Sequence, residues 1–403
     1  MSTSTGTPHR SPPAVLSLGF RPFFLLGALF AVVMIALWVP WFLGLIAVPS
    51  AFPPVAWHAH ELLFGFMPAV MAGFLLTAVP NWTGRRPIAG WPLAGLVLLW
   101  LAGRIAIAVS TYLDPVLIAA LSVAFPIVLA AVVGREIVLA GNGRNLKIVL
   151  VLTGLAAADL LFHYEIWQFG RPRHAQLAAV ALALLLLIII SGRIVPTFTA
   201  NWLKANRAGA PLPPAFDRID LATVLLSGAA LLAWAGFSFL HTVPGGRPLI
   251  ASMMLGAAAA NFLRQARWQP HRTGAEPLLA ILHVAYVFVG LGFLLGGLGV
   301  LWDDYDYATA GVHAWTAGAI GTMMIAVMSR VSRGHTGRPL TAPAGTVVLY
   351  VLILIAAAAR IAAGLHPQTT SLLLPVSGLA WIGAFGGFVA LYGRMLVSPR
   401  VQG

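Results

Sequence analysis

Histidines at the edge of an apolar segment are the residues of this sequence with the clearest chemical potential. His58, His60 and Glu61 open a stretch of roughly 20 mainly apolar residues, the length that crosses the hydrocarbon core of a bilayer. An unpaired ionisable side chain in a membrane span costs about 3 kcal/mol or more, so such side chains usually have a function. Imidazole suits iron, copper and zinc. The cluster therefore predicts a metal or cofactor site.

The same arrangement occurs a second time near the C-terminus. Each copy has a histidine, a glycine five residues later and a Thr-Gly-Arg sequence that starts 23 residues later: His60, Gly65 and Thr83 in the first copy, and His313, Gly318 and Thr336 in the second. We interpret the match as an internal repeat of one membrane helix.

His58 and His60 are predicted to serve different partners. Residues two apart on a regular helix point about 200° away from each other, so both rings cannot bind one ion unless His58 precedes the helix. Glu61 is three residues from His58 and shares its face. This spacing predicts a carboxylate that orients the His58 ring.

The composition indicates a polytopic membrane protein. Of 403 residues, 60% are hydrophobic and 9% are charged, far from the values of soluble domains. The chain has no cysteine, which excludes disulfides, iron–sulfur clusters and covalent haem attachment through thioethers. A metal must then be held by His, Met, carboxylate or backbone groups, and a haem would be non-covalent and b-type.

Apolar runs bounded by Pro, Gly and charged residues predict an all-α protein with twelve membrane spans in one domain, residues 22–397. Residues 1–21 and 398–403 are predicted to be cytoplasmic tails. We place the spans at 22–45, 57–79, 91–110, 115–140, 147–168, 174–200, 217–240, 247–268, 276–300, 307–330, 343–364 and 372–397.

The distribution of basic residues predicts that both termini lie inside the cell. With this orientation, only Arg171, Arg173 and Arg247 of the 24 Lys and Arg residues lie in outer loops, and Arg104 and Arg360 lie near outer helix ends. The net charge of +13 then follows from membrane topology. No nucleic-acid partner is needed to explain it.

Four histidines are predicted to share a layer near the outer surface: His58, His60, His163 and His313. At about 1.5 Å per residue they lie close to outer helix ends, which favours one shared centre. His163, followed by Tyr164, fits a ligand and an interfacial polar residue equally well.

His283 is predicted to stand apart from this layer, near an inner helix end, with Tyr286 three residues further on. A metal ligand and a hydrogen-bonding core residue are equally good interpretations. Four methionines along the two repeated helices do not exclude copper, although such spacing is more typical of packing: Met67, Met71, Met323 and Met324. The arginines available for haem propionates are Arg104, Arg171, Arg173 and Arg360.

Spans 2, 6 and 10 each have a His-Ala pair near the outside, at His58, His174 and His313, and each ends in a basic, turn-rich sequence. Helices four spans apart would meet if the chain formed three four-helix units around a common interior. The sequence predicts this arrangement.

Spans 2, 5, 6, 9 and 10 contain, in this order, WHAHELLFGF with GFLLTAVPNWTGRRP, LLFH at His163, GRIVPTFTANWLK at Arg193, EPLLAILHVAY at His283, and HAWTAGAIGTMMIAVMSRVSRGHTGRPL. Together these motifs resemble the NnrS family of bacterial inner-membrane proteins, in which they occur in the same order. The resemblance implies a twelve-helix protein that contains haem and copper and is associated with denitrification and tolerance of nitrosative stress. It makes metal-ligand candidates of His58, His60, His163, His283 and His313. It also marks Asn81, Trp82, Arg193, His335 and Arg338 as motif residues without an assigned role.

A second resemblance holds only at the level of the fold. Catalytic subunits of haem–copper oxidases and nitric oxide reductases also use twelve spans in three four-helix units. Their adjacent His-His pair is missing here, so the analogy favours bound haem more than turnover.

We therefore expect an inner-membrane haem protein, with copper as a further candidate, that handles nitric oxide reaching it through the lipid bilayer. His60 and His313 are the expected axial ligands. One alternative is a nitric oxide reductase-like enzyme fed by a quinol or another electron donor. The other is a proton-coupled transporter without haem that uses Glu61, Asp159, Glu165 and Glu276.

Overall fold

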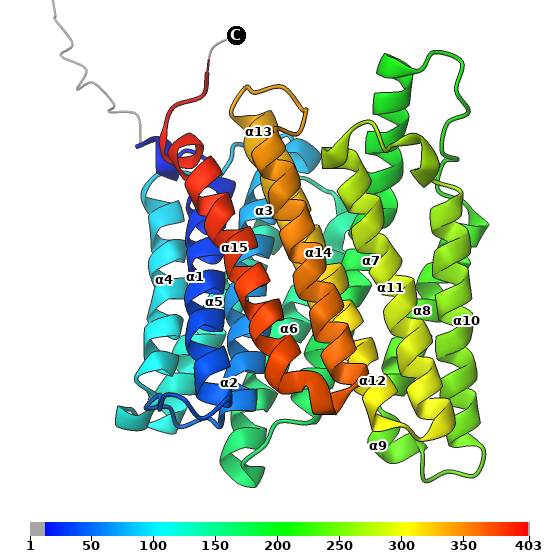
Figure 1. Ribbon diagram of the computed structural model, residues 1–403. Coiled ribbons are helices and arrows are strands. Elements are labelled where there is room, and N and C mark those ends of the chain that lie inside the picture. The colour runs from blue at the N-terminus through cyan, green and yellow to red at the C-terminus, as the bar shows by residue number, and fades with distance from the viewer. Residues whose placement is uncertain (1–12, 402–403) are drawn as a thin grey trace, which may run out of the picture.

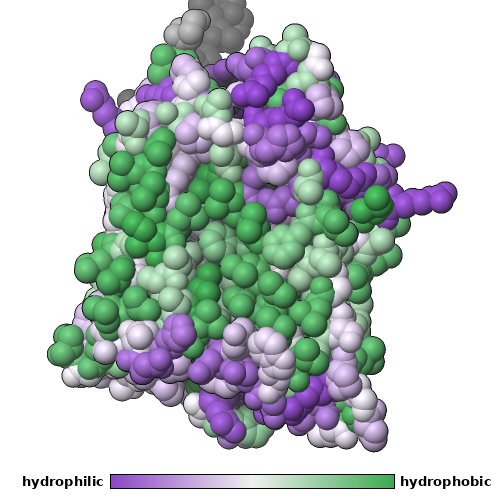
Figure 2. Space-filling model, turned by 45° about the vertical axis from the view of Figure 1, so that its right-hand side comes forward, coloured by the Kyte–Doolittle hydropathy of each residue, from purple (hydrophilic) through white to green (hydrophobic). Residues whose placement is uncertain are grey.

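The protein is a bundle of helices that cross a membrane. The computed structural model describes residues 13–401, and every regular element in that range is helical. Eleven of the described helices are long and apolar enough to span a bilayer. Figure 2 shows the matching surface, a hydrophobic band between two hydrophilic rims. These findings confirm the predicted all-α polytopic membrane fold.

The membrane-crossing part of the chain consists of the following elements, shown in Figure 1. They are α1 (Phe20–Phe42), α2 (Pro54–His60), η2 (Glu61–Phe66), α3 (Met67–Thr83), α4 (Trp91–Ala108), α5 (Pro115–Leu139), α6 (Leu146–Phe169), α7 (His174–Asn206), α8 (Arg218–Ala235), α9 (Phe237–Leu240), α10 (Gly246–Ala266), α11 (Pro277–Trp302), α12 (Tyr305–His313), η6 (Ala314–Gly321), α13 (Thr322–His335), α14 (Ala344–Leu365) and α15 (Thr370–Val397).

The predicted spans differ from these helices mainly at their ends. Spans 2, 6 and 10 extend to Thr83, Asn206 and His335, because polar residues continue each helix beyond its apolar run. Span 7 stops at Ala235, and the short α9 follows. Of the two predicted tails, residues 1–12 and 402–403 lie outside the described residues.

Helix α10 corresponds to the eighth predicted span, 247–268, and is the least apolar of the twelve. It is not among the eleven helices that hydropathy alone selects, yet it has 21 residues and packs between α8 and α11. The start of α1 and the end of α15 lie at the same end of the bundle (Figure 1), where Arg21 donates hydrogen bonds to the carbonyls of Leu396 (2.9 Å) and Ser398 (2.5 Å). Termini on one side require an even number of crossings, which α10 completes.

The two repeated segments fold in the same unusual way. A π-helical stretch, η2, begins directly after His60, and a second, η6, begins directly after His313. Both join an α-helix on either side into one long span. Such π-helical stretches are rare and are frequent at functional sites, because they change which side chains share a face. The internal repeat is thus a repeat of local structure as well as of sequence.

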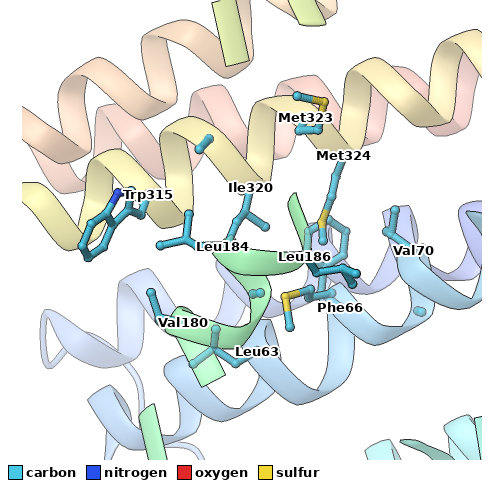
Figure 3. Close-up of a cluster of buried hydrophobic side chains, with 14 of the residues drawn as sticks. Leu63, Phe66, Val70, Val180, Leu184, Leu186, Trp315, Ile320, Met323 and Met324 are labelled. Atoms are coloured by element: carbon cyan, nitrogen blue, oxygen red, sulfur yellow. The ribbon is translucent and has the colours of Figure 1, made fainter. Parts of the chain in front are cut away.

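Spans 2, 6 and 10 meet in the interior, as the predicted three-unit arrangement requires. Both η2 and η6 pack against α7, and α3 packs against α13. Figure 3 shows side chains of these three spans, including Leu63, Leu184 and Ile320, pointing toward one another.

Candidate metal and cofactor site

A group of two histidines and one carboxylate is buried in the bundle interior. His60 Nε2 lies 3.1 Å from Asp159 Oδ1, and His163 Nε2 lies 3.5 Å from the same oxygen. One ligand atom from each residue falls within 4.8 Å of the others, and all three residues are buried. Asp159 and His163 are four residues apart on α6, so they share one face of that helix, opposite His60.

Hydrogen bonds hold this group in place. Glu61 accepts from His60 Nδ1 at 2.7 Å and also pairs with Arg104. The hydroxyl of Ser122 donates to Asp159 Oδ2 at 3.0 Å and accepts from Arg104 at 3.2 Å. Carboxylates that bond ligating histidines and fix their rings are a common feature of metal sites.

The partner of Glu61 differs from the sequence prediction. Glu61 is predicted to orient His58, but its carboxylate bonds His60 instead. The reason is that η2 begins at Glu61, so the regular i to i+3 relationship to His58 does not apply there. The prediction that His58 and His60 serve different partners is confirmed: His58 lies in α2 and stacks on Trp38, with ring centroids 3.7 Å apart.

The residues present fit a metal ion. Both His60 nitrogens face carboxylate oxygens, and a metal ion at Nε2 would take the place of a proton between that nitrogen and Asp159. His163 Nε2 is buried and makes no hydrogen bond within the described chain. Two imidazoles and a carboxylate form a donor set of intermediate softness that suits zinc, iron or copper(II).

A second group of candidate residues consists of His58 on α2, His313 on α12 and Arg360 on α14. His313 interacts electrostatically with both Arg360 and His58, which places the three residues in one region of the bundle. His58 Nδ1 is buried and has no hydrogen-bond partner among the described residues, and the same is true of the indole nitrogens of Trp38 and Trp57. The four histidines of the predicted layer therefore form two clusters rather than one shared centre.

This second set fits the polar end of a haem site. A haem needs an imidazole with a free nitrogen, apolar or aromatic walls and a cation near its propionates. His58 offers the free nitrogen, Trp38 offers a flat aromatic wall, and the half-buried Arg360 offers the cation.

An apolar pocket lies between the same three central spans. Its volume is about 90 Å³, and α3, α7 and α13 with η6 line it. The lining includes all four methionines noted in the sequence, Met67, Met71, Met323 and Met324, with Ser191 as a rare polar member. Figure 3 shows Met323 and Met324 beside Ile320 and across from Leu186 and Val70.

The remaining candidate residues lie elsewhere. Arg171, Arg173, Tyr164, Asn81 and Arg193 are exposed, Arg193 bonding Asn145 at 3.1 Å. Trp82 packs on Phe74, His335 lies beside Phe20, and Arg338 has a buried nitrogen that makes no hydrogen bond within the described residues. Tyr286 bonds Asn261 (2.7 Å) and Arg264 (3.1 Å). His283, on α11, bonds Thr199 at 2.9 Å.

Two residues of the site were not predicted as ligands or supports from the sequence. Asp159 entered only as a carboxylate of a transport path, and Ser122 did not enter at all. The available signal is the spacing Asp159 to His163, an acidic residue one turn before a histidine within an apolar span. Ser122 has no comparable signal, because its role depends on how α5 packs against α6.

Fold and site together define a polytopic membrane protein with a buried histidine–carboxylate centre among its spans. The chain belongs to the NnrS family, described as NnrS protein, which it matches over residues 14–400. No curated protein and no solved structure matched the chain. Membership confirms the resemblance of the sequence motifs and supports a membrane protein of the nitric oxide response.

Proposed function

We propose that this protein binds b-type haem and a second metal ion, with copper as a candidate, in the bacterial inner membrane, and that it handles nitric oxide in nitrosative-stress tolerance or denitrification. The observation that carries the proposal is the buried His60–Asp159–His163 group. Uncompensated carboxylates and imidazoles are costly in a membrane interior and are usually kept for function.

The two clusters support a division of roles. His60 is committed to two carboxylates, whereas His58 has a free buried nitrogen next to His313 and Arg360. We therefore assign the metal ion to His60, Asp159 and His163, and haem to His58 and His313. Ferrous haem, when bound, supplies an iron that binds nitric oxide.

The apolar pocket supports a gaseous ligand. Nitric oxide is small and nearly apolar, so it partitions into lipid and needs no polar channel. An apolar pocket of about 90 Å³ among the central spans offers it a place within the same bundle interior.

The transporter alternative finds less support. Two of its four carboxylates close helix ends: Glu165 accepts backbone N–H groups at the start of α7, and Glu276 accepts that of Leu278 at the start of α11. These carboxylates satisfy the free N–H groups of helix N-termini. The reductase alternative differs from the proposed binding of nitric oxide only because it also requires an electron donor.

The test is an absorption spectrum of the detergent-purified protein, oxidised and then reduced, with metal analysis of the same sample. We expect a Soret band that shifts when nitric oxide is added to the reduced protein. Alanine at His58 or His313 should remove the band, while alanine at His60 should remove the second metal and retain the band. His366→Ala, at an exposed loop histidine, is the matched control.

A folded protein that shows no Soret band after expression with haem supplied would refute the proposal and favour the transporter. Steady consumption of nitric oxide with an artificial donor would favour the reductase.

A further inference from the structure

A second pocket lies far along the bundle from the metal group, between the inner ends of α10 and α11. Its volume is about 350 Å³, which is within the range of small-molecule sites, about 300–1,000 Å³. One face of α11 contributes Ala280, His283, Val284 and Val287. Because α11 ends where α12 begins, its first turns are at the opposite end of the bundle from α2 and α12 (Figure 1).

The rim of this pocket faces the lipid. Phe262 on α10 is 36% exposed, and Val284 and Val287 on α11 are 36% and 42% exposed. These side chains lie within membrane-spanning segments, so their exposed surface meets lipid rather than water. A ligand would therefore enter from the bilayer and would be lipophilic.

The only imidazole that lines the pocket is buried and has a nitrogen without a partner. His283 is 3% exposed, and its Nδ1 makes no hydrogen bond within the described chain. The backbone is also fixed at this point, because Gln265 donates to the His283 carbonyl at 2.5 Å.

The hydrogen bonds determine which form of the ring faces the pocket. Both contacts of the Thr199 hydroxyl are satisfied together when it donates its single proton to the Val195 carbonyl at 2.9 Å and accepts from His283. His283 Nε2 must then carry the proton. In the neutral ring Nδ1 is left as an acceptor.

We propose that this pocket binds the head group of a membrane quinol. The pocket offers a buried acceptor inside lipid-facing apolar walls, and a quinol combines a lipophilic body with hydroxyl groups that donate hydrogen bonds. The oxidised quinone has carbonyl oxygens only and cannot donate to Nδ1. The hydrogen bond to Nδ1 therefore favours the reduced form. This inference does not depend on whether the protein binds haem.

The experiment measures binding of decylubiquinol, kept reduced without oxygen, to the full-length protein in lipid nanodiscs. Decylubiquinone and the dimethyl ether of the quinol are the comparison ligands, since neither has a hydroxyl to donate. One hydrogen bond to an otherwise unpaired buried group predicts roughly tenfold tighter binding of the quinol.

Three variants separate the chemistry from the shape of the pocket. His283→Phe should abolish the preference for quinol, and Ala280→Phe should block all three ligands by filling the pocket. Thr199→Val frees the His283 ring to place its proton on either nitrogen. The difference in affinity between quinol and quinone should therefore become smaller, while the protein stays folded. Leu263→Phe changes a lipid-facing residue on α10 that does not line the pocket, so this variant should bind all three ligands with the affinities of the wild type.

Equal affinity of the wild type for quinol and quinone would overturn the proposal. So would undetectable binding of the quinol, or quinol binding that persists unchanged in both His283→Phe and Ala280→Phe.

Discussion

Asp159 is the residue on which the candidate metal group depends most. One of its oxygens lies within 3.1 Å of His60 Nε2 and 3.5 Å of His163 Nε2, and the other accepts the Ser122 hydroxyl. A single carboxylate on α6 thus connects this helix to α2 through His60 and to α5 through Ser122.

Asp159→Asn should reduce the affinity for the second metal at least tenfold, because the amide keeps the shape but loses the negative charge. Metal content after dialysis against a competing chelator measures this effect. Ser122→Ala is the matched control, since it removes one support of the same carboxylate and leaves its charge in place. Equal metal retention in Asp159→Asn and wild type would contradict the assignment.

Arg264 illustrates a buried charge with a structural role. Its Nε donates to Asp220 at 2.7 Å, and both residues are almost fully buried. Gly192 on α7 makes room for the Arg264 side chain, because a Cβ at this position would lie 2.0 Å from Arg264 Nη2.

Arg264→Met should lower the free energy of unfolding by about 3–5 kcal/mol, because it leaves the buried Asp220 charge with only the more distant Arg267, at 3.7 Å. Thermal unfolding in detergent measures the loss. Arg267 pairs mainly with the exposed Asp217, whose pKa this arginine holds below its usual range, and lies 3.7 Å from Asp220. Arg267→Met should therefore lower the free energy of unfolding much less. A similar loss of stability in the two variants would show that burial of the ion pair does not determine its contribution.

The two π-helical stretches are the elements that set the site apart from a regular bundle. Each contains the glycine of the sequence repeat, and each glycine admits an aromatic ring. A Cβ on Gly65 would lie 2.8 Å from both Phe30 and the Arg104 guanidinium, and one on Gly318 would lie 2.6 Å from Phe288. The repeated glycines are therefore required by close packing rather than by backbone conformation.

Gly65→Ala should displace Arg104 from Glu61 and weaken metal binding, with a loss of about 1–3 kcal/mol in stability from overpacking. Gly318→Ala should cost a similar amount of stability. Metal content and thermal unfolding together measure these effects. Gly95→Ala in α4 has open space around its Cβ and should be neutral or stabilising by up to about 1 kcal/mol. Unchanged metal binding and stability in Gly65→Ala would refute this role.

Elements were predictable from the sequence to the extent that hydropathy defines them. The helices, the repeat of His60 and His313 and the meeting of spans 2, 6 and 10 follow from apolar runs and spacing. The π-helical stretches could not be predicted in this way, because the extra residue per turn leaves no mark in the composition. For this reason the predicted partner of Glu61 was wrong. Pairs such as His60 and Asp159, which are 99 residues apart, depend on how the helices pack, and this packing cannot be read from a single sequence.

At the scale of the whole molecule, the polar clusters and the apolar pocket are arranged in sequence along the central spans. His60 and His313 each directly precede a π-helical stretch, and the helix that follows the stretch, α3 or α13, lines the pocket. Ligands that reach the clusters from the bilayer can therefore pass through an apolar interior rather than through the polar rims seen in Figure 2.

Filling the central pocket should slow gas access without changing the site itself. Ile190→Trp adds a large ring to the α7 wall, far from any histidine in its own span. Association of nitric oxide after flash photolysis should be several-fold slower than in the wild type, while the equilibrium spectrum stays the same. Bound xenon, which occupies dry apolar cavities, should be lost in parallel and can be measured whether or not haem is present. Leu263→Trp, at a lipid-facing position on α10, controls for the added ring. Association at the wild-type rate in Ile190→Trp, with xenon binding lost, would mean that nitric oxide reaches the site by another route.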